Sequence, residues 1–314
     1  MNATLTPKGV TPSIVRPSSD IWSRYLTALD ASERTRDTYR KALKRYRSWL
    51  ARTGITWDEV TRELVISYKT ALASTPLSAH TVNAYLAAVR SFYTWTESER
   101  IYPNVAHNVH GLKCSRNAGK EALTVDQARH VLLPNGSTLK AKRDRAIVTL
   151  MLTRGLRCVE VVRANVGDVS NSGGKTILYL QGKGRADRGE FVILDGLAER
   201  ALSAYLAERA VSDSNAPLFA STANRNRGER MTTRAVSGIA KEALRDAGID
   251  STRITAHSLR HTAVTLSLVG GASVQEAQAL ARHAHISTTM VYAHNLDRMR
   301  AVPEQAIDRV LGLF

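Results

Sequence analysis

Two stretches near the end of this 314-residue chain decide how the rest is interpreted: His257-Ser-Leu-Arg-His261 and Leu280-Ala-Arg-His-Ala-His-Ile-Ser-Thr-Thr-Met-Val-Tyr-Ala-His294. The first places His257 and Arg260 three residues apart, so on one helical turn both side chains can reach the same phosphate. The second carries His283 and, nine residues later, Tyr292. Together these groups can bind a phosphodiester and attack it covalently without a metal ion.

Cleavage of a phosphodiester needs a nucleophile, positive charge on the non-bridging oxygens and an acid for the leaving oxygen. Arg157 and Arg260 are candidates for the charge, because a guanidinium holds two phosphate oxygens and stays protonated. Tyr292 is the candidate nucleophile, although its ordinary pKa of about 10 means that nearby positive charge must activate it. Lys183, between two glycines, is the candidate acid. Taken singly, each residue has an ordinary alternative: a surface ion pair, a half-buried aromatic or a solvated turn.

The histidines allow more than one interpretation. His257 and His261 are four residues apart and would share a helix face, a spacing also found in zinc sites. Ser258 stands where such sites usually carry Glu, and no third ligand is evident, so we interpret His261 as structural. His283 is a candidate for a hydrogen bond or a proton transfer near neutral pH.

The charge balance of the chain indicates a polyanionic partner. Lys and Arg number 44 against 28 Asp and Glu, a formal net charge of +16. Nucleic acid is the usual partner of such a protein, while a generic basic surface or a ribosome-associated protein is the alternative. Cys114 and Cys158 lie far apart, so neither a disulfide framework nor a Cys-based zinc site is predicted.

The amino-terminal part of the chain and its hydropathy favour a cytoplasmic protein. No run of about twenty apolar residues is present to span a membrane, and residues 1–19 lack the apolar core of a signal peptide. Those residues contain three prolines and no acidic residue, so we expect a flexible basic arm.

Residues 20–108 repeat apolar side chains at three- and four-residue steps without a strand pattern, which predicts a small all-helical domain. The expected helices run from Ser19 or Asp20 to Leu29, from Glu33 to about Ala51, from Thr56 or Asp58 through Leu72, and from about Ser78 to Ser98.

The second of these expected helices is strongly basic, with eight Lys or Arg and two acids between Glu33 and Arg52. Four of the basic residues step by three or four and share a face: Arg36, Arg40, Lys44 and Arg47. A solvated helix face is the commoner fate of such a run. Because few acids compensate the charge, we predict that this face binds DNA phosphates.

Residues 109–121 are basic and lack apolar periodicity, so we expect an exposed linker, followed by a second domain over residues 122–314. Thr124 and Gln127 form a capping box that should open a helix. A further helical region is broken at Arg154-Gly-Leu-Arg157. Two short alternating runs predict a hairpin whose glycine-rich, basic tip carries Lys183, namely Ile177–Leu180 and Glu190–Leu194, and helical patterns fill most of the remainder.

In order and spacing, these motifs resemble the tyrosine recombinase (phage integrase) family over nearly the whole chain. The matching pieces are Arg154-Gly-Leu-Arg-Cys-Val-Glu160, Gln181-Gly-Lys-Gly184, His257-Ser-Leu-Arg-His261 and residues 280–294. Two positions depart from the family pattern. Arg282 stands where a glycine usually precedes the histidine, which affects the local turn and suggests an extra DNA contact, and Arg154 replaces a small residue before Gly155.

The resemblance implies a mainly α fold with a small antiparallel β-hairpin or sheet, in which a helical core-binding domain and a mixed α/β catalytic domain form a two-domain clamp around duplex DNA. Tyr292 would form a 3′-phosphotyrosine, with Arg157, Arg260, His257 and His283 stabilising the pentavalent state and Lys183 acting as general acid. No cofactor is implied. Four protomers would exchange strands through a Holliday junction, and the need for an excisionase or a host DNA-bending protein stays open.

The role of the chain's end and the rival functions also stay open. A tail helix from about Leu296 to Phe314 would dock on a neighbouring protomer or pack on its own domain. The rival functions are a type IB topoisomerase-like nicking and closing enzyme, a non-catalytic sequence-specific DNA-binding protein, and a zinc hydrolase using His257 and His261. The recombination site, and whether the chain serves a mobile element or resolves chromosome dimers, is not readable from the sequence.

Overall fold

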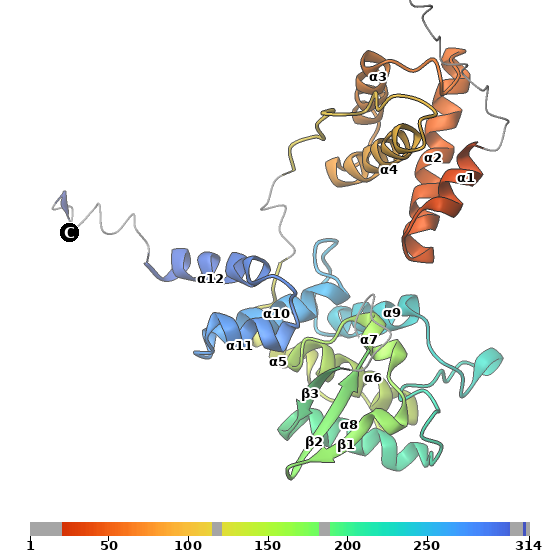
Figure 1. Ribbon diagram of the computed structural model, residues 1–314. Coiled ribbons are helices and arrows are strands. Elements are labelled where there is room, and N and C mark those ends of the chain that lie inside the picture. The colour runs from red at the N-terminus through yellow and green to blue at the C-terminus, as the bar shows by residue number, and fades with distance from the viewer. Residues whose placement is uncertain (1–20, 115–120, 182–188, 302–309, 312–314) are drawn as a thin grey trace, which may run out of the picture. The chain divides into compact units, whose positions relative to one another are not determined.

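The computed structural model describes residues 21–114, 121–181, 189–301 and 310–311, with side chains described up to residue 294 and at 310–311. The chain divides into two compact units, Met1–Ala118 and Gly119–Phe314 (Figure 1). The flexible arm predicted for residues 1–19, the hairpin tip with Lys183 and most of the predicted tail lie outside the described residues. None of the helices in the described ranges combines the length and apolar character that a membrane span requires.

The first unit consists of four helices, α1 (Ile21–Ala28), α2 (Glu33–Thr53), α3 (Arg62–Ala73) and α4 (Ala79–Ser98). Ser32 and Ser78 cap the starts of α2 and α4, each accepting a hydrogen bond from the backbone N–H three residues on. The core between the helices is rich in aromatic rings, and Trp22 stacks on Phe92 with ring centroids 4.3 Å apart. The predicted all-helical character of this part of the chain is confirmed.

Two boundaries in the first unit differ from those predicted. Helix α3 begins at Arg62 rather than near Thr56, because the Thr56 hydroxyl bonds to Asp58 (2.6 Å) and Glu59 (2.8 Å) and closes a turn instead. The stretch after residue 108 is not simply an exposed linker. Val109 is buried in the core, and Asn83 of α4 clasps the backbone of Leu112 through both its amide atoms.

In the second unit helices pack against one face of a small sheet, and the other face exposes Tyr179, Phe191 and Ile193 (Figure 1). Its helices are α5 (Val125–Val131), α6 (Leu139–Thr153), α7 (Cys158–Arg163), α8 (Gly196–Arg209), α9 (Thr233–Asp246), α10 (Ala256–Val269), α11 (Val274–Ala281) and α12 (Ile286–Ala301), with two short 3-10 turns, η1 (Val166–Asp168) and η2 (Asn224–Asn226). The capping box predicted at Thr124 and Gln127 is present at the start of α5.

The sheet has three antiparallel strands in the order β1 (Val169–Ser172), β2 (Lys175–Leu180) and β3 (Glu190–Leu194). The predicted hairpin is confirmed, with Leu178 opposite Val192. The edge strand β1 was not predicted, because its sequence Val-Ser-Asn-Ser is short, polar and mostly exposed. Leu178, Leu180 and Leu194 point into the core, so the second unit is a mainly helical domain with a small antiparallel sheet, as expected.

Candidate active site

Three separate parts of the second unit supply the predicted site residues. Arg157 caps the start of α7, directly after the break in the helical region. His257, Arg260 and His261 lie on α10, His283 lies in the turn between α11 and α12, and Tyr292 lies on α12. The chain can break between α6 and α7 because Gly155 adopts a left-handed backbone with φ of +62°.

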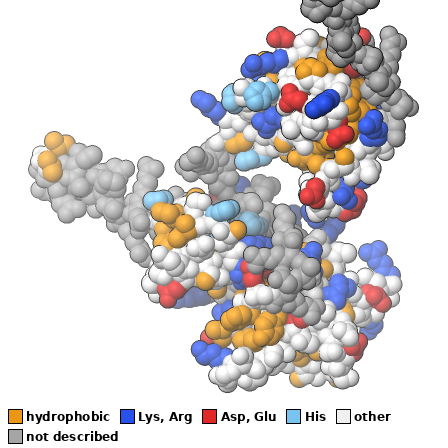
Figure 2. Space-filling model, viewed as in Figure 1, with side chains coloured by type: hydrophobic (Ala, Val, Ile, Leu, Met, Phe, Trp, Pro, Cys, Tyr) orange, Lys and Arg blue, Asp and Glu red, His pale blue; other side chains and the backbone are white. Residues whose placement is uncertain are grey.

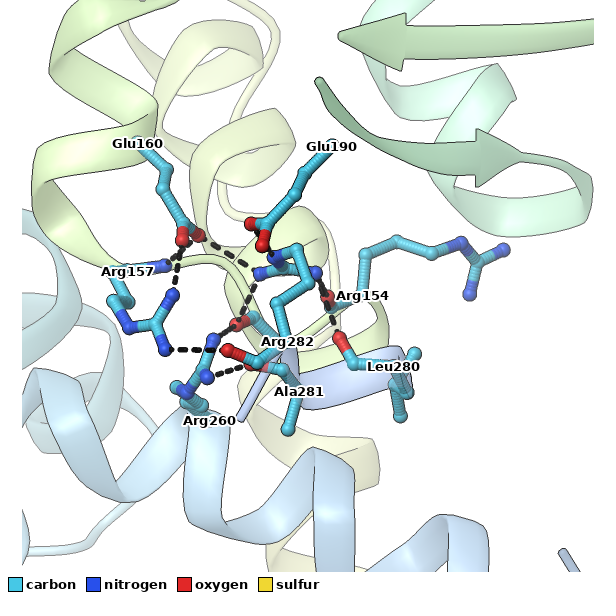
Figure 3. A network of polar contacts seen from close by, with 9 residues as sticks. Arg154, Arg157, Glu160, Glu190, Arg260, Leu280, Ala281 and Arg282 are labelled. Carbon is cyan, nitrogen blue, oxygen red and sulfur yellow. Dashed lines mark hydrogen bonds and ion pairs between the residues drawn. The ribbon is translucent and has the colours of Figure 1, made fainter. Parts of the chain in front are cut away.

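Arg260 is held at the centre of the site. Its side chain is buried, and its guanidinium donates to the carbonyl oxygens of Gly155 (2.6 Å) and Ala281 (Figure 3). Burial, together with the charges of Arg157 and Arg282, lowers the pKa of Arg260 to about 9. The group therefore still carries its charge at neutral pH, in a place where water screens that charge poorly.

Arg157 is oriented by a buried carboxylate. Its Nη1 donates to Oε1 of Glu160 (2.5 Å), its backbone N–H donates to Oε2 (2.7 Å), and its Nη2 donates to the carbonyl of Arg282 (3.2 Å). The Glu160 side chain is wholly buried, while about a quarter of the Arg157 side chain is exposed. The guanidinium is thus fixed at its base and open toward solvent, as a phosphate-binding group must be.

Glu160 stays ionised despite its burial. Burial raises the pKa of this carboxyl, but the charge of Arg282 and the hydrogen bonds and charge of Arg157 outweigh it and hold the pKa below its ordinary value. A charged carboxylate with several donors fits the capping of α7, where Glu160 closes the turn onto Arg157.

A row of rings runs across the site. His257 and His261 meet edge to face at 4.6 Å between ring centroids, His261 lies 5.1 Å from Tyr292, and His283 stacks on Tyr292 at 6.4 Å. A hydrogen bond joins the Tyr292 hydroxyl and Nδ1 of His261. Burial raises the pKa of Tyr292, and the charge of Arg260 works against that rise.

His283 is a neutral imidazole in this site. Burial and the neighbouring charges of Arg260 and Arg157, with smaller contributions from His261 and Arg282, lower its pKa to about 4. Its Nδ1 lies 2.9 Å from the Thr289 hydroxyl, which fixes the ring at the start of α12. At neutral pH this histidine can donate or accept a hydrogen bond without adding charge.

The structure therefore brings together five of the six predicted catalytic residues, namely Arg157, His257, Arg260, His283 and Tyr292. The sixth, Lys183, lies outside the described residues, although the described strands on either side of it form the predicted hairpin. Sequence reasoning did not anticipate the contact between His261 and the Tyr292 hydroxyl. The four-residue spacing from His257, which puts both rings on the same face of α10, was the sequence feature that could have placed His261 in the site.

Comparisons with known proteins agree with this geometry. Residues 121–299 match the model of the phage integrase family, and residues 20–100 match the phage integrase N-terminal SAM-like domain. The chain is 34% identical over 226 residues to tyrosine recombinase XerC of Thermodesulfovibrio yellowstonii, covering 69% of this chain and 72% of the relative. It is 30% identical over 286 residues to XerC of Pelobacter propionicus, covering 89% and 91% of the two chains.

The chain belongs to the phage integrase family. Its fold is also that of XerH site-specific recombinase bound to palindromic difH substrate, with a TM-score of 0.73 at 20% identity over 93% of this chain and 84% of the other. The fold is likewise similar to that of a lambda integrase fragment, a dimer bound to a core site, with a TM-score of 0.65 at 17% identity over 86% of this chain and 96% of the other. The resemblance inferred from the motifs is confirmed.

The two arginines that depart from the phage integrase pattern both make their contacts within the protein. Arg282 does not extend toward DNA as suggested, because 5% of its side chain is exposed and it bonds to Glu160 and to nearby carbonyls. Arg154 donates to the carbonyl of Ile193 (2.8 Å) and pairs with Asp195, which ties the end of α6 to β3. Both arginines stabilise the turns around the site.

The basic face of α2 is the other surface predicted for this phage integrase family member. Arg40 pairs with Glu33 (3.5 Å) and Asp37, and Arg36 donates to the Leu29 carbonyl (3.1 and 3.2 Å). Lys44 is exposed, and Arg47 lies over the Trp22 ring at 5.6 Å. The two acids of this helix therefore compensate more of the charge than the sequence suggested, at the end of the face that carries Arg36 and Arg40.

No group of three or more His, Cys, Asp or Glu side chains is arranged to hold a metal ion within the described ranges. His257 and His261 therefore do not form part of such a group among the described residues.

Proposed function

We propose that this protein is a site-specific DNA recombinase that breaks and rejoins strands through a covalent bond to Tyr292. One observation carries the proposal. In a member of the phage integrase family, two fixed guanidiniums, Arg157 and Arg260, converge on the turn between α11 and α12. The next helix, α12, places the Tyr292 hydroxyl against the imidazole that follows Arg260 in the sequence.

In the proposed cleavage step, the Tyr292 oxygen attacks the scissile phosphorus and the bond from phosphorus to the 5′ oxygen breaks. The products are a 3′-phosphotyrosine and a free 5′-hydroxyl. Arg157 and Arg260 bind the non-bridging oxygens as negative charge builds in the pentavalent state. His257 and His283 donate further hydrogen bonds, and Lys183 donates the proton to the 5′ oxygen.

The proton of Tyr292 also needs an acceptor. His261 is in contact with the hydroxyl through Nδ1 and is suited to hold the nucleophile and accept its proton. The positive charge of Arg260 favours the phenolate and offsets part of the larger effect of burial, which raises the pKa of Tyr292. Because the phosphotyrosine conserves the bond energy, attack by the 5′-hydroxyl of a second strand rejoins the DNA without ATP.

Strand exchange between two duplexes requires four cleavages, so the working form is a homotetramer on two DNA sites that passes through a Holliday junction. The four helices of the first unit and the second unit would together enclose the duplex, with Lys44 and its neighbours on α2 contacting phosphates. Such a protein acts in the cytoplasm on a mobile element or on the chromosome, with or without an excisionase or a DNA-bending protein.

A covalent capture experiment tests the proposal. Wild-type protein and the Tyr292→Phe variant are mixed with a pooled library of nicked duplexes in EDTA, denatured, and assayed for protein-linked DNA, which is then sequenced. We expect an adduct with the wild type only, and equal affinity for DNA in both proteins. An adduct formed by Tyr292→Phe would contradict the assignment of the nucleophile. Tight binding with no adduct from either protein would favour a non-catalytic DNA-binding protein.

A further inference from the structure

The turn between α11 and α12 has an unusual residue at its centre. Arg282 follows α11 and adopts a left-handed backbone with φ of +51°, a conformation that favours glycine. A side chain is therefore retained at a position where its backbone is strained. Such strain persists only where the surrounding contacts stabilise it, and it is common at functional sites.

The Arg282 side chain makes those contacts inside the protein. Its Nη2 donates to Oε2 of Glu160 (2.8 Å) and to the Gly155 carbonyl (3.0 Å). Its Nη1 donates to the carbonyls of Leu280 (2.7 Å) and Arg154 (3.3 Å). Figure 3 shows Arg282 between the loop that carries Arg157 and the end of α11. Each Nη of Arg282 thus donates to two acceptors inside the protein, which uses all four Nη hydrogens, whereas each Nη of Arg260 donates to one carbonyl in the described residues and keeps a second hydrogen for a phosphate oxygen.

Three arginines donate hydrogen bonds to consecutive backbone carbonyls at the end of α11. The carbonyl of Leu280 accepts from Arg282, that of Ala281 accepts from Arg260, and that of Arg282 accepts from Arg157. These oxygens form the negative end of the helix and would otherwise lack partners. The two candidate phosphate-binding arginines are thus fixed on the same turn that Arg282 holds.

The charges of the cluster give Arg282 a second effect. Arg157, Arg260 and Arg282 carry three positive charges. Glu160 and Glu190, whose carboxylate lies 3.9 Å from Nε of Arg282, carry two negative charges, so the cluster has a net charge of +1. Without Arg282 the same count is two minus two, or zero. Glu160 would then be balanced by Arg157 alone, and the charge that Arg157 presents to a phosphate would be largely cancelled.

We propose that Arg282 is a positioning residue for the cleavage reaction: it neutralises Glu160 so that the charges of Arg157 and Arg260 act on the scissile phosphate, and it fastens the turn on which both are held. This inference rests on the proposed recombinase function. It assigns a role to a side chain that never touches the DNA.

The test uses the full-length protein and the duplex recovered from the covalent capture experiment. The rate of adduct formation is measured under single-turnover conditions for wild type, Arg282→Gln, Arg282→Lys, Arg282→Gly and Glu160→Gln/Arg282→Gln. Arg200→Gln, an exposed position on α8, removes one positive charge outside the site and serves as the control.

We expect Arg282→Gln to slow adduct formation by about tenfold to a hundredfold, less than the loss of a direct phosphate contact. The double variant has the same net charge in the cluster as the wild type, so it should react at least about tenfold faster than Arg282→Gln. Arg282→Lys should restore part of the rate because it keeps the charge. Arg200→Gln should react like the wild type.

Three results would overturn the proposal. If Arg282 merely supports the turn, Arg282→Gly should be fully active, since glycine adopts this backbone freely, and the second substitution at Glu160 should slow the reaction further instead of restoring it. We expect the opposite in both cases. Equal rates for wild type and Arg282→Gln would likewise reject the proposal.

A measurement without DNA separates this inference from the proposed function. Urea unfolding of wild type, Glu160→Gln, Arg282→Gln and the double variant gives the coupling between the two side chains. We expect Arg282→Gln to lower the unfolding midpoint, and the double variant to recover part of that loss because no buried carboxylate is left short of a partner. Additive effects would reject the pairing. Failure of the wild type to form an adduct would reject the recombinase function, and with it the role on the phosphate, whatever the unfolding result.

Discussion

The protein has two clusters of arginines, and they differ in how each charge is held. On α2, the side chains of Arg36 and Arg40 are 35% and 52% exposed and pair with acids of their own helix. In the second unit, Arg260 and Arg282 are buried and donate to backbone carbonyls. Figure 2 shows how widely Lys and Arg are spread over the visible surface, whereas Figure 3 shows Arg157, Arg260 and Arg282 converging on one turn.

The difference shows what burial does for an arginine. A surface guanidinium is screened by water and salt and can move, so each single contact is weak and replaceable, and such groups contribute to affinity through their number and not through exact geometry. A guanidinium fixed by carbonyls costs desolvation, seen in the lowered pKa of Arg260, but it is already oriented before the substrate arrives. We therefore expect the α2 cluster to govern affinity and the buried cluster to govern the rate of cleavage.

The largest expected effect is on the buried cluster. Arg260→Ala should slow adduct formation by roughly a hundredfold to a thousandfold, because a transition-state charge contact contributes about 3 kcal/mol. Single-turnover assays on the captured duplex measure this, with circular dichroism to confirm folding. Arg157→Ala should slow adduct formation to a similar extent. It should destabilise the fold less than Arg260→Ala does, because the Arg157 side chain is more exposed. Cleavage at the wild-type rate by either variant would show that this arginine does not act on the phosphate.

A smaller effect on the cleavage rate should distinguish the two clusters when arginine is replaced by lysine, which keeps the charge and changes only the geometry. Arg260→Lys keeps the charge but cannot bridge the carbonyls of Gly155 and Ala281, so we expect about a tenfold slower cleavage. Arg40→Lys, on α2, should change neither cleavage nor affinity by more than about twofold. Equal responses to the two substitutions would mean that the buried cluster has no special geometric requirement.

A weaker effect should appear in the salt dependence of binding. Replacing Arg40 and Lys44 by Gln should lower the slope of log affinity against log salt by about one unit per lost phosphate contact. The substitutions Arg34→Gln and Lys41→Gln, on another face of the same helix, are the matched control and should leave the slope closer to that of the wild type. Fluorescence anisotropy at several salt concentrations measures this. An unchanged slope in the Arg40 and Lys44 variant would place DNA elsewhere.

The smallest expected effect concerns stability against pH. The folded pKa of His283 is about 4, below its ordinary 6.5, so between these values the unfolded chain binds a proton that the folded protein does not. The contribution of His283 to stability is therefore present above about pH 6.5 and is lost as the pH falls toward 4. Thermal unfolding of wild type and His283→Gln between pH 4 and 7.5 measures it, and the variant should show the shallower decline. Parallel curves would contradict the depressed pKa.

Much of the architecture was predictable because it depends on local patterns. Apolar side chains at helical spacing predicted the four helices of the first unit, and the capping box at Thr124 predicted the start of α5. Alternation predicted the hairpin of β2 and β3. The strand β1 and the start of α3 were missed, because a polar edge strand and a side-chain-closed turn leave no periodic signal.

The sequence by itself determined which residues could do chemistry: the arginines, histidines and tyrosine stand in motifs whose order and spacing identify the family. Only the tertiary structure decided how they are held. The contact of His261 with Tyr292 joins residues 31 positions apart. The hydrogen bond of Arg282 with Glu160 joins residues 122 positions apart. Burial and partners reached through the fold set the orientation and pKa of a charged group, and a side chain's identity alone cannot reveal either.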